Sequence, residues 1–512
     1  MRVTLDYLII GAGPAGLQLG ALLEADGDRD YLVLEGGESA GTFFRTFPRH
    51  RTLISINKPH TGTGDPELNL RLDWNSLLSD DPALLFTGYT ERYFPDADLM
   101  VRYLADFAAK TGVKVRYRAR VTRVARRDGV FVVTADREYR AHRVIVATGV
   151  SRMHLPEIPG IELAEPYDTM SVDPRDYLDQ RVLILGKGNS AFETADALME
   201  TTTVIHVAGP SSVRLAWRTH FVGHLRAVNN NFLDTYQLKS ANAILDGTVR
   251  RIERDGDGLR VTFAFARANE ITKELRYDRV LACTGFALDA SIFDETCRPA
   301  LAIDDRFPAQ TSAWESVDVP GLYFAGTLSQ QRDFKKSTSG FIHGFRYGVR
   351  ALHKILERRY ATTPWPASRI AAGPDAITAA VIARVNRSSA LWQQFGFLAD
   401  VVLIRPDGAD YLEEMPVAYF RDEHRDETAF TVTLEYGPQH DQVDPFDITV
   451  SRIAQDSPGQ AHDAAYLHPV VRFHRGGELI ATHHLAENLE NRWDRPDVHV
   501  APLAAFVRRY LP

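Results

Sequence analysis

The stretch Asp6-Tyr-Leu-Ile-Ile10-Gly11-Ala-Gly13-Pro-Ala-Gly16 sets an apolar run directly before three spaced glycines. The residues from Leu17 to Ala25 predict a helix after the glycines, and a second apolar run, Tyr31 to Leu34, ends at Glu35. This order is typical of a βαβ unit that binds a dinucleotide. Gly11 permits the tight turn, Gly13 lets the backbone approach the pyrophosphate, and Gly16 allows the helix to pack closely on the strand. Glu35 is placed to accept hydrogen bonds from an adenosine ribose.

A second unit of this kind begins at the strand from Arg181 to Leu185, which is followed by Gly186-Lys-Gly188-Asn-Ser-Ala191. Alanine at the third position is a tolerated variant. No acidic residue follows the next strand, Val204 to Val207, but Arg214 and Arg218 come shortly after it. Because guanidinium groups attract a 2′-phosphate and a carboxylate repels it, we expect NADPH rather than NADH here. The alternative is that both arginines are solvated or paired within the fold.

Composition limits the class of protein. The 512 residues exceed what one hydrophobic core usually supports, so two or three domains are expected. The formal net charge of −8 argues against general nucleic-acid binding. The two cysteines, Cys283 and Cys297, form no Cys-x-x-Cys pair, so a thiol-disulfide redox centre is not indicated. No apolar run reaches the roughly 18 residues of a membrane helix. We expect a soluble cytoplasmic protein without a metal site, and a homodimer is left open.

Three apolar runs that end in small residues complete the pattern: Val144 to Gly149, Val280 to Gly285 and Tyr323 to Thr327. Small side chains at such points let the backbone come near a cofactor or a neighbouring strand. In this order the motifs resemble the class of flavin monooxygenases that contains FMOs, amine N-hydroxylases and Baeyer–Villiger enzymes.

Individual runs are similar to ERFAD-type FAD-dependent oxidoreductases of the endoplasmic reticulum. The similar runs are Phe47 to Lys58, Asp73 to Leu78, Tyr93 to Asp98, Gly188 to Glu193, Asp234 to Ser240, Gly340 to Tyr347, Phe395 to Asp400 and His468 to Val470. The resemblance therefore covers almost the whole chain.

This resemblance implies FAD at the first unit and NADPH at the second. In the monooxygenase class an asparagine after the first unit lies beside the flavin ring, and Asn57 in Ser55-Ile-Asn57-Lys58 matches that position. Asn57 is the predicted catalytic residue, and the alternative is an asparagine that only closes a turn. The predicted cofactor-binding residues are Gly11, Gly13, Pro14, Ala15, Gly16, Glu35, Asn57, Lys58, Thr148, Gly149, Gly186, Gly188, Asn189, Ser190, Arg214, Gly326 and Thr327.

The predicted fold is α/β, with two Rossmann-like dinucleotide-binding domains, the NADPH domain inserted in the FAD domain, and a C-terminal α+β appendage. Residues 1–160 and 287–360 are expected to form the FAD domain, 161–286 the NADPH domain and 361–512 the appendage. A helix is expected at about Gly340 to Leu356, and Pro364, Pro366 and Pro374 indicate a linker into the appendage.

Two departures from the resemblance bear on function. FMO and Baeyer–Villiger enzymes carry a Phe-x-Gly-x-x-x-His pattern before the second unit, but no histidine lies between Gly160 and Gly186, which argues against the Baeyer–Villiger reaction. Unlike ERFAD, the chain shows no secretory signal and ends in Arg508-Arg-Tyr-Leu-Pro512 without a retention tetrapeptide, so a different compartment is expected.

The expected function is an FAD-dependent monooxygenase that uses NADPH and O₂. It would oxygenate a small nucleophilic substrate through a flavin C4a-hydroperoxide, with N-hydroxylation of an amine such as an amino acid as the leading reaction. The alternative is an ERFAD-like oxidoreductase, or a flavin-binding scaffold that acts through protein partners.

Two groups are candidates for contact with the substrate. Arg332, Lys335 and Lys336 are candidates to pair with a substrate carboxylate or with the cofactor phosphates, although a solvated basic loop is the simpler interpretation. For Trp217, His220 and His224, ordinary packing is favoured over a place in a substrate cavity.

Overall fold

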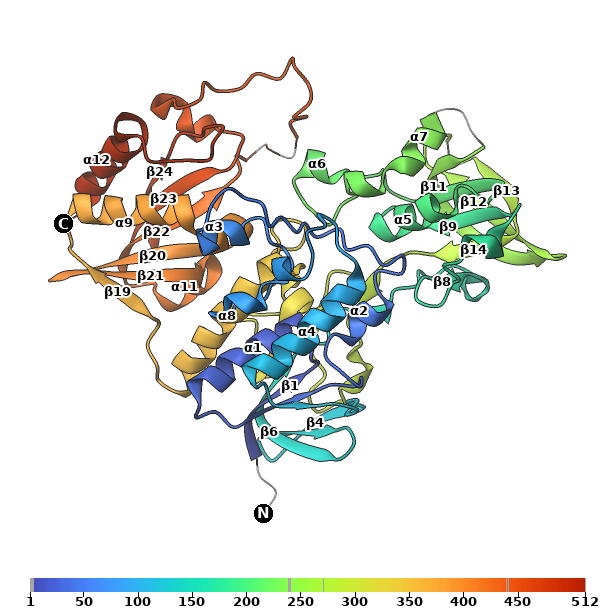
Figure 1. Ribbon diagram of the computed structural model, residues 1–512, viewed down its shortest axis with the longest axis horizontal. Helices are drawn as coiled ribbons and strands as arrows, with labels where there is room; N and C mark the ends of the chain where they lie inside the picture. Colours follow the sequence, from blue (N-terminus) through green and yellow to red (C-terminus); the bar gives the residue numbers. More distant parts are fainter. Residues whose placement is uncertain (1–3, 238–240, 270, 439, 441, 512) are drawn as a thin grey trace.

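The computed structural model describes residues 4–237, 241–269, 271–438, 440 and 442–511. Three large sheets organise the chain into three lobes (Figure 1). The lobe in blue and cyan contains the N-terminus, the green lobe is built on the second sheet, and the orange and red lobe contains the C-terminus. The last three residues of the run from Asp234 lie outside the described residues.

The first sheet has the order β3-β2-β1-β6-β5-β4, with β18 paired to β6. Its parallel strands are β1 (Thr4–Ile10), β2 (Tyr31–Leu34), β3 (Val115–Arg116), β6 (Glu138–Val146) and β18 (Leu322–Phe324), and its antiparallel hairpin is β4 (Arg123–Arg127) and β5 (Val130–Thr134). Tyr7 and Ile9 pack with helices α1 (Pro14–Asp26), α4 (Ala97–Thr111) and α8 (Ile342–Tyr360). Leu8 and Ile10 join a separate core cluster, as the alternation of a strand requires.

The second sheet has the order β13-β12-β11-β10-β9-β14-β8. Its parallel strands are β8 (Glu165–Pro166), β9 (Arg181–Leu185), β10 (Val204–Gly209) and β14 (Arg279–Ala282), and a meander of β11 (Ala243–Asp255), β12 (Gly258–Phe265) and β13 (Thr272–Tyr277) extends it. Helices α5 (Asn189–Leu198) and α7 (Asn231–Gln237) belong to this lobe. Since β18 returns to the first sheet after β14, the second dinucleotide-type fold is inserted in the first, which confirms the predicted fold class.

The third sheet is antiparallel, with the order β19-β21-β20-β22-β23-β24. Its strands are β19 (Ala367–Ile370), β20 (Leu398–Arg405), β21 (Gly408–Pro416), β22 (Thr428–Glu435), β23 (His468–Arg475) and β24 (Glu478–His484). Its helices are α9 (Pro374–Arg387), α10 (Ser389–Gln393), α11 (Val417–Glu423) and α12 (Ala501–Tyr510). Val401, Leu403 and Leu412 share a core cluster with Leu352 and Ile355 of α8, so this lobe packs directly on the first.

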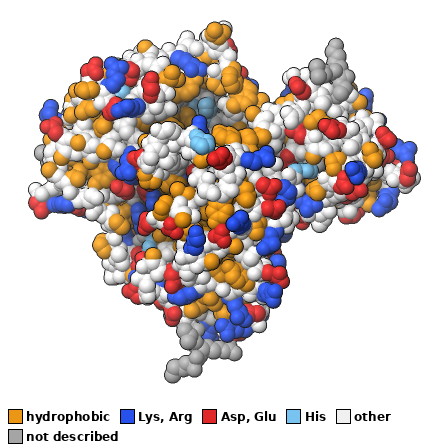
Figure 2. Space-filling model, in the orientation of Figure 1, with side chains coloured by type: hydrophobic (Ala, Val, Ile, Leu, Met, Phe, Trp, Pro, Cys, Tyr) orange, Lys and Arg blue, Asp and Glu red, His pale blue; other side chains and the backbone are white. Residues whose placement is uncertain are grey.

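Short elements complete the chain. They are α2 (Thr42–Thr46), α3 (Pro66–Leu70), α6 (Ala216–Thr219), β7 (Arg152–Met153), β15 (Phe286–Ala287), β16 (Leu301–Ala302) and β17 (Phe307–Pro308). Basic and acidic side chains are interspersed over the face seen in Figure 2. Among the described helices, none combines the length and the apolar character that crossing a bilayer requires.

Candidate functional site

A cavity of about 440 Å³ lies where the first and second lobes meet the start of α8. Its wall includes the beginnings of α1 and α5, the turn after β6 and the segment after β18. The predicted cofactor residues on this wall are Gly13, Pro14, Ala15, Thr148, Gly149, Asn189, Ser190, Gly326 and Thr327. Both dinucleotide-type turns therefore open onto the same cavity.

The first glycine turn has the geometry that a bound pyrophosphate needs. A Cβ on Gly11, whose φ is +105°, would lie 2.8 Å from the Ala147 carbonyl oxygen. One on Gly16 would lie 1.9 Å from the Gly11 carbonyl oxygen, whereas one on Gly13 would meet nothing within 4 Å. Gly11 and Gly16 are thus required by packing, and Gly13 leaves open space before the N-terminus of α1, where a phosphate binds favourably.

Glu35 is buried at the end of β2 and organises the loop beside this turn. Its carboxylate accepts hydrogen bonds from the backbone N–H of Ala12 (2.8 Å) and Gly37 (2.7 Å) and from the hydroxyl of Thr42 (2.9 Å). A carboxylate has about four acceptor sites, so these bonds leave capacity for a ribose hydroxyl.

The second glycine turn repeats the geometry of the first. A Cβ on Gly186 would lie 2.2 Å from the Cys283 carbonyl oxygen, and one on Gly188 would meet nothing within 4 Å. The Asn189 amide at the start of α5 donates to the His224 carbonyl (2.8 Å) and accepts from the Arg226 N–H (3.0 Å). Asn189 therefore fixes the loop that closes the cavity on this side.

Of the basic groups near the end of β10, the sequence analysis predicted Arg214 as a cofactor contact but not Lys187 or Arg267. Lys187, within the glycine turn, forms an ion pair with Asp246 and donates to the Ser211 carbonyl (2.9 Å). Arg267 also pairs with Asp246 (3.2 Å) and donates to the Ser212 hydroxyl (3.1 Å). The predicted Arg214 is exposed. Partial desolvation of the Lys335 ammonium group, followed by the charges of Arg214 and Arg306, lowers the pKa of Lys335.

Asn57 and Lys58 do not line the cavity. Asn57 is fully buried, and its amide donates to the carbonyls of Thr90 (2.7 Å) and Arg92 (3.2 Å). Lys58 is exposed. The Asn57 amide nitrogen ties down the segment before α4, while its Oδ1 is buried without a partner among the described residues. The neighbouring residues Thr52 to Ser55 line the cavity.

The predicted substrate contacts also lie off the cavity wall. Arg332 is partly buried and donates to the Gln310 carbonyl (3.0 Å), while Lys335 and Lys336 are exposed. This agrees with the simpler interpretation of these two lysines as a solvated basic loop.

Trp217, His220 and His224 pack away from the cavity wall, as the sequence analysis favoured. The rings of Trp217 and Phe446 are 4.9 Å apart, and the ring of His220 lies 5.0 Å from that of Tyr436. The segment that carries Trp217 and His220 therefore contacts the C-terminal lobe. His224 accepts or donates a hydrogen bond with the Thr219 hydroxyl (2.6 Å).

Sequence reasoning missed Glu193, which lines the cavity one helical turn after Asn189 on α5. The Tyr167 hydroxyl donates to its carboxylate, and burial raises the pKa of Glu193 to about 7. The signal in the sequence was its spacing. Glu193 follows the predicted cofactor residue Asn189 by four positions, which puts both on the same face of a helix. Such a group changes its charge near neutral pH, and perturbed groups in clefts are candidates for proton transfer.

Trp74, Arg226 and His343 form another wall that was not predicted. The rings of Trp74 and His343 stack at 4.1 Å, and the Arg226 guanidinium lies 5.4 Å from the Trp74 ring centre. Trp74 and His343 belong to runs that carry the family resemblance, but their convergence depends on the tertiary fold.

The cysteines take no part in the cavity wall. Both are free and buried, and burial raises the pKa of Cys297 to about 11 and that of Cys283 further. Cys283 and Cys297 belong to separate core clusters, so the two thiols do not form a dithiol pair.

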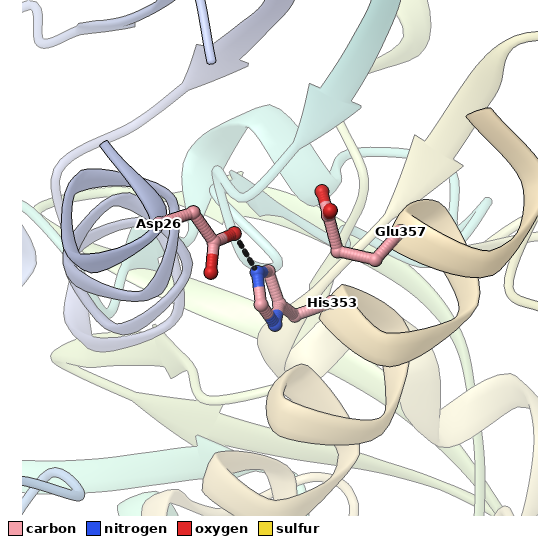
Figure 3. Close-up of side chains that lie close together, drawn as sticks. All are labelled: Asp26, His353 and Glu357. Carbon is pink, nitrogen blue, oxygen red and sulfur yellow. Dashed lines mark hydrogen bonds and ion pairs between the residues drawn. The ribbon is translucent and has the colours of Figure 1, made fainter. Parts of the chain in front are cut away.

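Asp26, His353 and Glu357 come close together between α1 and α8 (Figure 3). The His353 ring is hydrogen-bonded to Asp26 (2.7 Å), and Glu357 accepts from Arg29 Nε (2.9 Å), which holds the pKa of Glu357 below its usual range. Because Asp26 and Glu357 already have these partners, the cluster serves as a bridge between the two helices.

Comparison with known proteins covers most of the chain. Residues 8–326 match the model of a family described as pyridine nucleotide-disulphide oxidoreductase. Over 99% of its length the chain is 39% identical to FAD-dependent oxidoreductase domain-containing protein 2 of Mus musculus, of which 84% is covered.

Solved structures share the two-domain fold. A flavin-containing monooxygenase from Stenotrophomonas maltophilia superposes with a TM-score of 0.54 at 20% identity, over 70% of this chain and 98% of that one. A bacillithiol disulfide reductase from Staphylococcus aureus superposes with a TM-score of 0.53 at 19% identity, over 70% of this chain and all of that one. The fold therefore does not by itself choose between oxygenation and disulfide reduction.

Proposed function

The chain belongs to the family of FAD-dependent oxidoreductase domain-containing protein 2 and, over residues 8–326, to the pyridine nucleotide-disulphide oxidoreductase family, and we propose that it is an NADPH-using flavin monooxygenase. Its substrate is a small nucleophile, with N-hydroxylation of an amine as the leading reaction. The observation that carries this proposal is one cavity onto which both glycine turns open and to which no thiol contributes.

Bound FAD would supply the redox chemistry, taking a hydride from NADPH and passing electrons to O₂. The open space before Gly13 and the α1 N-terminus would hold the FAD pyrophosphate, and Gly188 with α5 would hold that of NADPH. Phe43, Phe47, Phe286 and Phe341 make much of the wall apolar, which excludes water from the reacting groups. Glu193 is placed to hold or release a proton at its carboxyl group.

The test is to reduce the FAD-loaded protein with NADPH and then add O₂ in the presence of a panel of amines. We expect NADPH to reduce the flavin faster than NADH, and less hydrogen peroxide than NADPH consumed when an amine accepts the oxygen atom. Mass spectrometry would show a product that is heavier by one oxygen. Full release of peroxide with every amine, or no reduction by NADPH, contradicts the proposal.

A second function remains in view, because the similarity to the mouse protein spans 99% of the chain and so includes the C-terminal lobe. In that case the protein is a flavin oxidoreductase or scaffold that acts through protein partners. A scaffold would bind FAD but turn over NADPH negligibly in the same assay. Homodimerisation and a cytoplasmic location stay predictions.

The nucleotide preference is tested separately. We propose that Arg214 or Arg267 contacts the 2′-phosphate. Arg214→Ala and Arg267→Ala are compared for the KM of NADPH and of NADH, and the variant that removes the contact should raise only the KM of NADPH. An equal effect on both nucleotides, for both variants, contradicts a 2′-phosphate contact.

A further inference from the structure

Arg226 places a cation on the cavity wall without an acidic partner. Its backbone is held by Asn189 at the start of α5, and its side chain crosses to the first lobe, where Nη1 donates to the Ile54 carbonyl (3.0 Å). In the part of the chain that the structure describes, no carboxylate forms an ion pair with Arg226. Burial lowers the pKa of Arg226, but a guanidinium stays charged in proteins. A partly buried charge of this kind is costly unless a ligand neutralises it.

His343 lies beside Arg226 with two polar atoms that have no partner. Its side chain is 2% exposed, and neither ring nitrogen has a hydrogen-bond partner among the described residues. The ring is held between Trp74 (4.1 Å) and Phe341 (5.7 Å, planes 7° apart), so its orientation is fixed. Burial, followed by Arg346 and Arg226, keeps the pKa of His343 well below its usual value, so the ring is neutral and offers one donor and one acceptor. Both nitrogens are buried away from the cavity surface, so His343 acts on the cavity through its ring, which holds the Trp74 ring in place.

The cofactors' pyrophosphates do not account for this wall. Each has its own glycine turn and helix N-terminus, at Gly13 with α1 and at Gly188 with α5. Arg226 thus lies on a part of the wall that is separate from both pyrophosphate turns. A planar guanidinium beside stacked aromatic rings suits a planar carboxylate, which it binds through two parallel N–H groups.

We propose that Arg226 and Trp74 form the subsite that binds the carboxylate of the substrate, so that the substrate class is a small carboxylic acid. This inference rests on the proposed function, because it assigns the substrate of the same cavity. Arg226 pairs with the carboxylate, and Trp74 packs against the adjoining apolar part of the molecule. His343 holds the Trp74 ring in place by stacking on it.

The experiment uses the oxidised, FAD-loaded protein without NADPH or O₂. Calorimetry measures the binding of benzoate and 3-phenylpropanoate, each against its uncharged amide. We expect at least one acid to bind about tenfold or more tightly than its amide. Arg226→Gln should remove that difference, whereas His343→Phe, which keeps a stacked ring beside Trp74, should preserve it. Arg175→Gln, at an exposed arginine of the same lobe, is the matched control, and flavin absorbance verifies that each variant holds FAD.

Each other outcome overturns the subsite. If neither acid binds more tightly than its amide, no carboxylate site exists. If Arg226→Gln weakens the binding of NADP⁺ but not of the acids, Arg226 is a contact of the nucleotide phosphates. The proposed oxygenation is judged independently: acid binding without oxygenated product leaves the subsite intact and removes the monooxygenase function, whereas oxygenation of neutral amines without acid preference does the reverse.

Discussion

Gly13 and Gly16 belong to one glycine turn, yet an added methyl group would meet different surroundings at each. At Gly16 it would collide with the Gly11 carbonyl oxygen, and at Gly13 it would enter the open space before α1. We predict that Gly13→Ala folds with an unchanged melting temperature in the absence of FAD but binds FAD at least about tenfold more weakly, a loss of about 1.4 kcal/mol. Gly16→Ala should lower the melting temperature itself.

Gly64→Ala is the control for this pair, since a Cβ there also meets nothing within 4 Å and lies in a loop away from the cavity. FAD titration followed by flavin fluorescence, with melting curves of the apoproteins, gives both quantities. Normal FAD affinity in Gly13→Ala would show that the open space is not the pyrophosphate site.

At this scale the sequence predicts backbone roles better than side-chain directions. The turn motif alone predicts why Gly11, Gly13 and Gly16 lack a side chain. The structure agrees, with close backbone contacts at Gly11 and Gly16 and open space at Gly13. Asn57 was placed beside the flavin by its position in a motif, but its amide points to the carbonyls of Thr90 and Arg92. Those partners belong to a loop more than thirty positions further along the chain, so the local sequence could not indicate them.

Glu193 supplies a prediction about pH. Its pKa is about 7 in the folded protein, against 4.5 for an ordinary glutamate, because burial disfavours the charged form. The folded protein thus holds this proton more tightly than the unfolded chain, and the stability that the group contributes is lost as pH rises from about 4.5 through about 7. The glutamine in Glu193→Gln does not titrate, so this variant does not lose stability at this position as pH rises.

We therefore expect Glu193→Gln to gain stability relative to the parent protein between pH 5.5 and pH 8, by about 1 to 2 kcal/mol after allowance for partial exposure. Urea unfolding of both proteins at the two pH values measures this difference. If the difference in unfolding free energy between the two proteins is the same at both pH values, the pKa of Glu193 is not raised.

At the scale of elements, α8 holds the segment that carries Trp74 to the cavity. Arg346 of α8 is fully buried, and it donates to the carbonyls of Leu70 (2.7 Å), Asp73 (3.0 Å) and Ser76 (2.8 Å). We predict that Arg346→Lys lowers the free energy of unfolding by about 3 kcal/mol, because one ammonium group cannot reach all three carbonyls. FAD release should become faster at the same time.

Arg102→Lys on the exposed face of α4 is the matched control and should leave both quantities unchanged. Melting curves and the rate of flavin release at one fixed temperature measure them. A loss below about 0.5 kcal/mol in Arg346→Lys would mean that the segment is held by other contacts.

Element positions were largely predictable, because each βαβ unit combines hydrophobic runs with glycine turns. The strands from Tyr31 and Arg181 have their expected bounds, and the helix expected from about Gly340 is observed at Ile342–Tyr360. The contact between α3 and α10 could not be predicted from the sequence. Glu67 of α3 accepts from the N–H (3.0 Å) and the hydroxyl (2.7 Å) of Ser389, a contact between residues far apart in the chain.

At the scale of the whole molecule, the C-terminal lobe is more closely integrated than the word appendage implies. The composition and proline pattern indicated a separate α+β unit after a linker, and the antiparallel sheet agrees with that class. However, Leu403 and Leu412 of this sheet share a core with Leu352 of α8. Hydrophobic periodicity shows that each element has an apolar face but not which other face covers it.

The same interface predicts the behaviour of a chain that ends at Tyr360. Removal of the C-terminal lobe would expose Leu352 and Ile355, and it would leave the buried Arg71 without the carbonyls of Val385 (3.1 Å) and Ser388 (3.3 Å). Exposed apolar surface and an unsatisfied buried cation both destabilise a fold. We expect this truncated chain to aggregate, or to melt at least about 10 °C below the full chain and to retain less FAD. Light scattering, melting curves and flavin content measure the outcome. A monomeric 1–360 chain with full FAD content and an unchanged melting temperature would show that the first two lobes are complete without the third, and that the shared core adds no stability to the flavin site.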